Sequence, residues 1–204
     1  MHNNVVQAGA RYFQQSLGIS TLRFDFVGWQ LSWGSYQAQQ VEEAANFLLH
    51  GGEEEDNNDN NHHKKRPTKI LLVGYSYGSL LAASASANIP ECVGVVSIAP
   101  PWSVKHWLLL FNSGHHLRQA QAREDLPKLF ITGDHDNFTS ETVFSKTLET
   151  FPSDTTTGVV LPNLDHFFHR REKDAMKEIG KWLLKVFPKC QGDLKQLASG
   201  KVFE

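Results

Sequence analysis

The sequence predicts an α/β protein in which helices cover both faces of a mostly parallel sheet. Short apolar runs that are typical of buried strands alternate along the chain with stretches whose apolar residues recur at helical spacing. Glycine and polar residues directly follow three of these runs, and ligand-binding residues of parallel α/β sheets gather at such strand ends. The apolar runs are residues 70–73, 92–100, 128–133 and 158–161.

Two helices and one strand are expected before the first apolar run. Residues 4–17 carry apolar side chains at helical spacing, Gly18 ends that helix, and residues 21–27 then alternate as a strand does. Residues 35–50 form a second amphipathic helix that two glycines stop. The stretch 51–66 is charged, of low complexity and free of apolar residues, so we expect a disordered loop there.

The most specific motif is a Gly-x-Ser-x-Gly pattern at residues 74–78, between an apolar run and a helix rich in small residues. A strand that turns sharply into a helix around a serine holds that serine at a strained apex with its hydroxyl exposed. The glycines permit close backbone approach, and the helix N-terminus favours developing negative charge. Ser76 is therefore a candidate nucleophile, with a turn that carries no chemistry as the alternative.

A serine nucleophile needs a base, and the base needs an orienting acid; after such an elbow they follow in the order Ser, Asp, His. Asp136 follows the third apolar run and His166 follows the fourth, so both are expected at the same rim of the sheet as the serine. Asp134 is an alternative acid, and His135 or His169 is an alternative base.

The segment 101–126, between the second and third apolar runs, has the character of a short lid. It contains Trp102 and Trp107 together with several leucines, which suits either a wall over an acyl pocket or a helix packed on the core. The remaining expected elements are helices at 141–151 and 171–187 and a polar C-terminal tail at 191–204.

At these motifs the chain resembles the α/β-hydrolase superfamily, and within it the small esterase-like serine hydrolases with little or no lid. The resemblance implies an α/β-hydrolase-like three-layer sandwich with Ser76 as nucleophile, Asp136 as acid and His166 as base. It also implies that the backbone N–H of Tyr77 belongs to the oxyanion hole, and we expect Tyr75, Trp102 and Trp107 near the pocket. The stretches that match are 3–6, 18–34, 74–79, 128–136 and 163–168.

The chain departs from the family pattern in two places. The family has an arginine and a glycine where this chain has Val27 and Gln30. The family's third strand, and the His/Gly-rich loop that supplies the second oxyanion N–H, precede the segment that matches residues 1–6. The resemblance thus implies a fold shortened at its N-terminal side, from a truncated gene model or in a smaller complete protein. Residues 21–27 would then pair directly with residues 70–73 or leave an open slot.

Composition narrows the partners and the groups that the protein could bind. With 204 residues, 40% of them hydrophobic, the chain is most simply one domain at 1–190 followed by the tail. A net charge of −2 gives no electrostatic case for nucleic acid or an anionic membrane, and no apolar run reaches the roughly 18 residues that a membrane span needs. Two cysteines and the absence of a signal pattern favour a cytoplasmic protein. Adjacent His62 and His63 make a poor metal site, so we expect neither a metal nor an organic cofactor.

The function that these observations predict is a serine hydrolase that cleaves an ester, a thioester or a related acyl bond through an acyl-enzyme on Ser76. The partner would be a small-molecule acyl substrate, with the oligomeric state left open. The alternative is a non-catalytic binding module, or a truncated inactive homologue, with the same fold. The missing oxyanion segment and the altered loop at Val27 motivate that second hypothesis.

Overall fold

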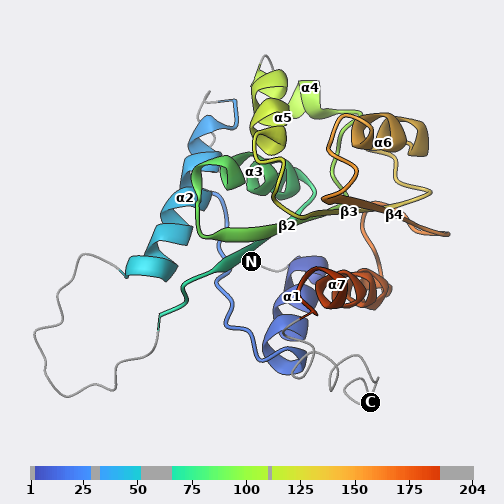
Figure 1. The fold of residues 1–204 in the computed structure, drawn as a ribbon. Helices are drawn as coiled ribbons and strands as arrows, with labels where there is room; N and C mark the ends of the chain where they lie inside the picture. Colours follow the sequence, from blue (N-terminus) through green and yellow to red (C-terminus); the bar gives the residue numbers. More distant parts are fainter. Residues whose placement is uncertain (1–2, 29–32, 52–65, 110–111, 189–204) are drawn as a thin grey trace, which may run out of the picture.

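The computed structural model describes residues 3–28, 33–51, 66–109 and 112–188. Within these ranges, four parallel strands form one sheet in the order β1-β2-β3-β4 (Figure 1). The strands are β1 (Ile70–Tyr75), β2 (Cys92–Ile98), β3 (Lys128–Gly133) and β4 (Thr156–Leu161). All four predicted apolar runs are strands, and the predicted α/β class is confirmed.

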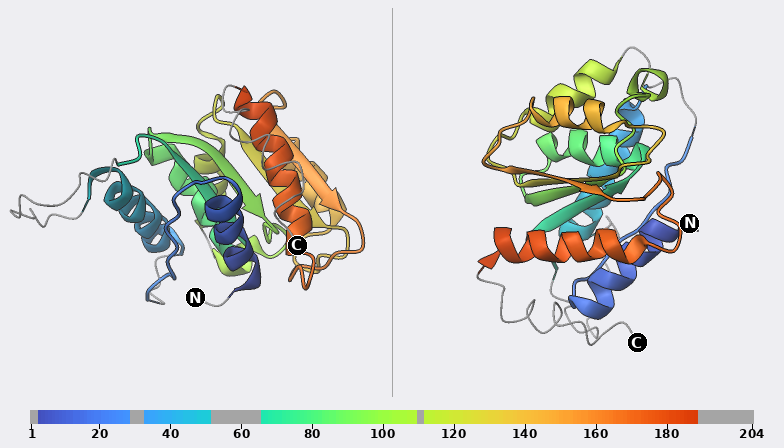
Figure 2. Two further views of the ribbon diagram at one scale, coloured as in Figure 1. Left: turned by 90° about the horizontal axis from the view of Figure 1, so that it is seen from below. Right: turned by 90° about the vertical axis from the view of Figure 1, so that its right-hand side faces the viewer.

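Helices cover both faces of the sheet, as the two turned views in Figure 2 show. Helices α2, α3, α5 and α6 lie on one face, and α1 and α7 lie on the other (Figure 1). The helices are α1 (Asn4–Arg11), α2 (Ser35–His50), α3 (Tyr77–Ala85), α4 (Lys105–Leu108), α5 (Ser113–Gln121), α6 (Glu141–Leu148) and α7 (Glu172–Val186), with a π-helical turn η1 (Tyr12–Ser16) and a 3-10 turn η2 (Ser86–Asn88).

The hydrophobic core consists of two clusters, one on each face of the sheet. Successive side chains of a strand point to opposite faces, so neighbouring residues of one strand belong to different clusters. Val95 of β2 packs with the α2–α3 side, whereas Val96 packs with α1 and α7. Both valines are fully buried, which explains why β2 reads as a continuous apolar run rather than as an alternating one.

The helix predicted at 35–50 is α2 (Ser35–His50), and glycines mark both of its ends. Gly34 has φ 90° and Gly51 has φ 83°, a left-handed backbone conformation that residues with a Cβ rarely adopt. The helix predicted at 4–17 is α1, which continues as the π-helical turn η1.

The strand predicted at 21–27 is wrong. The described residues of this segment form no ladder with β1, whose one neighbouring strand in the described part of the chain is β2. Instead, the side chain of Gln40 on α2 bonds both backbone groups of Val27: Oε1 accepts from the N–H at 3.0 Å, and Nε2 donates to the carbonyl at 2.8 Å. An alternating pattern indicates a half-buried extended chain, but a strand also needs a partner, which the pattern does not supply.

Several predicted features lie outside the described residues. The tail at 191–204 and the altered position Gln30 do so wholly. Of the loop at 51–66, which contains His62 and His63, only residues 51 and 66 are described. Among the helices of the described ranges, none is long and apolar enough to cross a membrane.

Candidate active site

Ser76 occupies the turn between β1 and α3. Its backbone has φ 52° and ψ −127°, a sparsely populated conformation for a residue with a side chain. The turn is held by a hydrogen bond from the Ser76 N–H to the Ile98 carbonyl of β2, at 2.9 Å. It also needs a glycine at position 74, because a Cβ there would lie 2.4 Å from the Gly78 carbonyl oxygen. The predicted elbow is thus present, and its strain is local to the serine.

Asp136 lies just beyond the end of β3 and is buried. Its Oδ1 accepts a hydrogen bond from the Phe138 N–H at 2.7 Å, and the Thr132 hydroxyl lies 3.4 Å from its Oδ2. The backbone bond at Oδ1 fixes the orientation of the carboxylate. As a result, Oδ2 points to the loop after β4.

His166, in the loop after β4, joins the other two side chains. Its Nε2 lies 2.8 Å from Ser76 Oγ, and its Nδ1 lies 2.8 Å from Asp136 Oδ2. An ionised carboxylate only accepts hydrogen bonds, so we assign the proton of the neutral imidazole to Nδ1, which leaves Nε2 to accept from the serine hydroxyl. The His166 side chain is buried. Its two partners, Ser76 and Asp136, are 90 and 30 positions away in the sequence, so the fold brings the three side chains together.

The alternative acid and bases take other places. Asp134 Oδ1 accepts from the Leu164 N–H at 3.1 Å, and backbone hydrogen bonds from Asn163 and Leu164 lower the pKa of this carboxyl. His135 is 67% exposed beside Asp134, and His169 stacks on Phe167. The contact to the His166 ring therefore comes from Asp136 rather than Asp134.

Three aromatic rings surround the imidazole of His166. The ring centroids of Phe138, Phe167 and Tyr75 lie 4.4, 5.6 and 5.7 Å from it. Phe138 is 37% exposed and Phe167 is 48% exposed, so both present aromatic surface to solvent beside the histidine. Sequence reasoning missed these two phenylalanines; the available signal was their position within two residues of Asp136 and His166.

Tyr77, the expected oxyanion residue, is the first residue of α3, where a backbone N–H has no acceptor within its own helix. Its side chain packs edge-on against Phe26 at 6.1 Å, and burial raises the pKa of its phenol. Trp102 is buried in the core and stacks on Phe144 at 5.3 Å. Trp107, in contrast, is 83% exposed. That either tryptophan lines an acyl pocket beside Ser76 stays a prediction.

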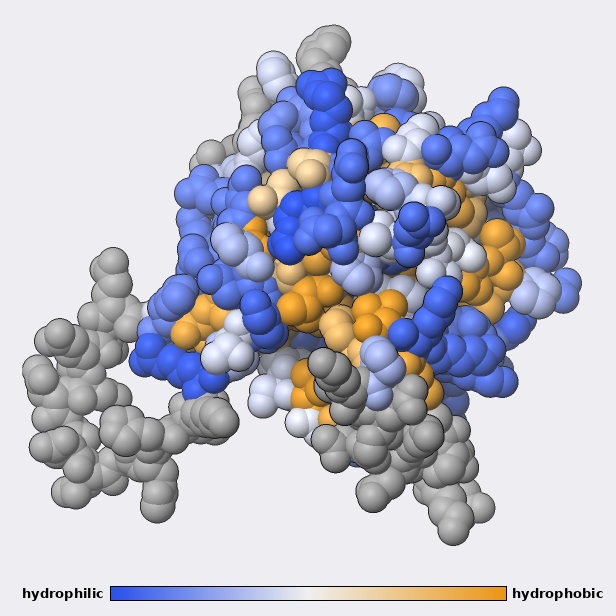
Figure 3. Space-filling view, viewed as in Figure 1, coloured by the Kyte–Doolittle hydropathy of each residue, from blue (hydrophilic) through white to orange (hydrophobic). Residues whose placement is uncertain are grey.

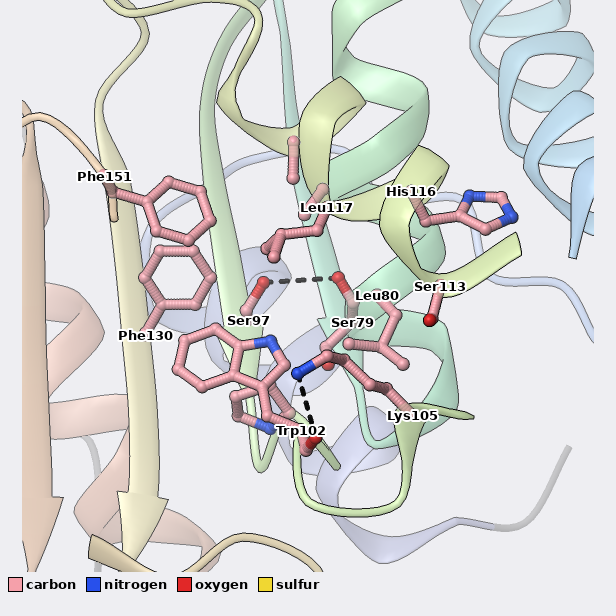
Figure 4. Close-up of a pocket in the computed structure, with 13 residues that line it drawn as sticks. Ser79, Leu80, Ser97, Trp102, Lys105, Ser113, His116, Leu117, Phe130 and Phe151 are labelled. Carbon is pink, nitrogen blue, oxygen red and sulfur yellow. Dashed lines mark hydrogen bonds between the residues drawn. The ribbon is translucent and has the colours of Figure 1, made fainter. Parts of the chain in front are cut away.

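A cavity lies between α3, β2 and α5, with Trp102 as one wall (Figure 4). Lys105 lines it and donates from Nζ to the Trp102 carbonyl at 3.3 Å, and burial lowers the pKa of this lysine. The residues that line the cavity do not include Ser76, Asp136 or His166. In the described part of the chain, no three His, Cys, Asp or Glu side chains gather closely enough to hold a metal ion.

Solved structures with the same architecture include proteins named serine hydrolase and esterase. An α/β serine hydrolase without a lid from Xanthomonas campestris matches at 25% identity and a TM-score of 0.67, over 92% of this chain and 76% of that one. By fold, the chain belongs to the α/β-hydrolase superfamily. An α/β serine hydrolase homologue from Coxiella burnetii matches at 22% identity and a TM-score of 0.65, over 88% of this chain and 76% of that one.

The esterase domain of a Rhodothermus marinus protein matches at 17% identity and a TM-score of 0.66, over 90% of this chain and 81% of that one. No protein-family model and no curated protein matches the chain. In the α/β-hydrolase fold the nucleophile stands at a strand-to-helix turn, which is the place of Ser76 in this chain.

Proposed function

We propose that this protein is a serine hydrolase that cleaves an ester, a thioester or a related acyl bond through an acyl-enzyme on Ser76. The observation that carries the proposal is the chain of two 2.8 Å contacts from Ser76 Oγ through the His166 ring to Asp136. Nucleophile, base and orienting acid in hydrogen-bonding distance are what acyl transfer by a serine requires. The similarity to structures named serine hydrolase and esterase supports the same reaction class.

In the first half of the reaction, Ser76 Oγ attacks the acyl carbon while its proton passes to His166 Nε2. The imidazolium that forms is stabilised by the Asp136 carboxylate at Nδ1. Collapse of the tetrahedral intermediate breaks the bond to the leaving alcohol or thiol, which takes the proton from Nε2. The products of this half are the free leaving group and an ester on Ser76.

In the second half, a water molecule gives one proton to His166 Nε2 and attacks the acyl carbon of the enzyme ester. Collapse of this second intermediate returns the proton from Nε2 to Ser76 Oγ and releases the acid. The negative charge on the acyl oxygen would be stabilised by the N–H of Tyr77 at the start of α3, where the helix dipole also favours an anion.

The surroundings of the base favour an uncharged group beside the bond that is cleaved. Phe138 and Phe167 flank the His166 ring and are partly exposed. Aromatic surface binds aliphatic or aromatic groups by burial of apolar area, whereas the negative faces of the rings do not offset the desolvation of an anion. We therefore infer a preference for neutral apolar esters over anionic ones.

The test is hydrolysis of a graded series of p-nitrophenyl acyl esters, with labelling by a fluorophosphonate probe as a second readout. We expect Ser76→Ala and His166→Ala to lose roughly 10⁴-fold or more in kcat, and Asp136→Asn to lose on the order of 10⁴-fold. Matched controls change the same residue types away from the contacts: Ser145→Ala on the exposed face of α6, His135→Ala, and Asp134→Asn. These three should keep most of the wild-type rate.

Wild-type protein that folds but neither hydrolyses the esters nor reacts with the probe would reject the proposal. The non-catalytic binding module would then be the better description. Activity that survives Ser76→Ala but not His135→Ala would instead move the reaction away from the elbow.

A further inference from the structure

Tyr75, the residue just before the candidate nucleophile, bonds the main chain of the candidate base. Its hydroxyl donates to the His166 carbonyl oxygen at 3.0 Å and so connects two residues 91 positions apart. The alternation of β1 places this side chain on the sheet face that α1 covers, together with Leu71. The contact is therefore distinct from the two bonds that the imidazole itself makes.

The position of the His166 ring depends on its backbone as well as on its ring partners. The bond from Nδ1 to Asp136 holds one corner of the ring, and the ring can still turn about that contact. Among the described residues, two bonds from outside the loop hold the main chain at His166 and Phe167: Tyr75 bonds the His166 carbonyl, and Asn4 Nδ2 bonds the Phe167 carbonyl at 3.2 Å. Of these two, Tyr75 acts on the histidine itself and belongs to the strand that leads into Ser76.

The hydroxyl of Tyr75 is itself oriented by the start of α1. Asn3 caps this helix through Oδ1, which accepts from the N–H groups of Val5 at 3.0 Å and Val6 at 3.2 Å. The side chain of Asn3 also faces the Tyr75 phenol and lowers its pKa. Since Oδ1 is occupied by these two N–H groups, Nδ2 is the part of the amide that is left to act on the phenol oxygen, whose own proton goes to the His166 carbonyl.

The phenol keeps its proton throughout the pH range of an esterase assay. Burial raises the pKa of Tyr75 to about 12, and the Asn3 side chain opposes this only in part. The donor to His166 is therefore present at every pH at which the reaction would be measured.

We propose that Tyr75 is a positioning residue, which ties the main chain of His166 to strand β1 and thereby holds Nε2 at hydrogen-bonding distance from Ser76 Oγ. The proposal rests on the proposed function for its catalytic meaning, whereas the positioning itself is a property of the fold. Tyr75 touches neither the reacting oxygen nor the acyl group in this assignment. It acts through the place of the base.

The experiment compares Tyr75→Phe with Tyr12→Phe, which removes the hydroxyl of a buried tyrosine in the core cluster that Tyr75 packs against. We expect Tyr75→Phe to lower kcat by about tenfold with little change in KM, since one net hydrogen bond is lost from the placement of the base. The low-field NMR resonance of the His166 Nδ1 proton should broaden in Tyr75→Phe, because the ring samples more orientations. Tyr12→Phe should leave both kcat and this resonance as in wild type.

A second variant keeps the test decisive if Tyr75→Phe does not fold. Asn3→Ser retains an oxygen that caps α1 but removes the amide that orients the Tyr75 hydroxyl. It should lower kcat by roughly threefold and broaden the same resonance to a smaller extent, as expected for a weakened rather than a deleted bond.

An unchanged Nδ1 resonance in both variants would overturn the proposal, as would a Tyr75→Phe protein that is less stable but retains wild-type kcat. Failure of the proposed function is distinguishable from this. Wild-type protein without esterase activity would reject the function, while the resonance would still decide whether Tyr75 positions His166.

Discussion

The loop that follows β4 leaves no room for a side chain at Gly133, the last residue of β3, which makes Gly133→Ala an informative perturbation. A Cβ at this position would lie 1.9 Å from the Leu164 carbonyl oxygen and 2.6 Å from its carbonyl carbon, and both are backbone atoms. Because Cβ contacts under 3.0 Å are essentially never found, one side must retreat, from 1.9 to 3.0 Å, by about 1.1 Å. Leu164 stands two residues before His166 in the same loop.

The size of this shift is enough to break the contact between base and nucleophile. If the loop moves as a unit, the 2.8 Å distance from His166 Nε2 to Ser76 Oγ can lengthen to about 3.9 Å, beyond hydrogen-bonding range. A misplacement of about 1 Å costs on the order of 10² in rate, so we expect a drop of that size in kcat. We also expect a loss of about 1–3 kcal/mol in the free energy of unfolding, because the site is overpacked.

The assay combines urea unfolding with hydrolysis of a p-nitrophenyl ester. The control is Gly9→Ala in α1, where the nearest atom to an added Cβ is Met176 Sδ at 3.9 Å, an ordinary contact. Alanine in a helix interior should raise the free energy of unfolding by about 0.5–1 kcal/mol and leave the rate unchanged. A Gly133→Ala protein as stable as wild type would refute the steric argument. A destabilised Gly133→Ala protein with full activity would refute the coupling between position 133 and His166.

Two further predictions concern buried polar side chains away from Ser76. His116 bonds Ser84 Oγ at 2.8 Å and the Trp33 carbonyl at 3.1 Å, and burial lowers its pKa in the folded protein below the ordinary 6.5. Its contribution to stability is therefore complete above about pH 6.5 and is lost as the pH falls towards the folded-state pKa, at up to about 1.4 kcal/mol per pH unit. Urea unfolding at pH 7.5 and 5.5 should show this dependence in wild type and less of it in His116→Gln; equal pH dependence in both would contradict the assignment. Lys128 donates from Nζ to the carbonyls of Arg123 at 2.5 Å and Leu126 at 3.1 Å. Lys128→Met should cost about 1–3 kcal/mol in urea unfolding with esterase activity retained, since two buried carbonyls lose their donor, and wild-type stability in this variant would count against that role.

Local patterns in the sequence were sufficient for most of the elements. The helix at Ser35–His50 was predictable from its apolar spacing and from the glycines that stop it, since Gly51 adopts a backbone conformation that other residues avoid. The four strands were predictable from their short apolar runs, which are continuous in the inner strands β2 and β3 because those strands are buried on both faces. The structure of the segment 21–27 could not be predicted in this way. Its residues alternate as in a strand, but the backbone of Val27 bonds the side chain of Gln40 instead of a neighbouring strand.

The elbow at Ser76 could be predicted from local sequence, because the strained turn, its glycines and the following helix all depend on neighbouring residues. Local sequence also narrowed the acid and the base to a few residues at strand ends. That Asp136 rather than Asp134 contacts His166, and that Tyr75 bonds the backbone of His166, follows from the packing of distant segments. These contacts join residues 30 and 91 positions apart, and their geometry follows from how the loops after β3 and β4 close over the end of β1. No periodicity within one segment carries that information, since hydrogen bonds depend on distances that only the packed sheet sets.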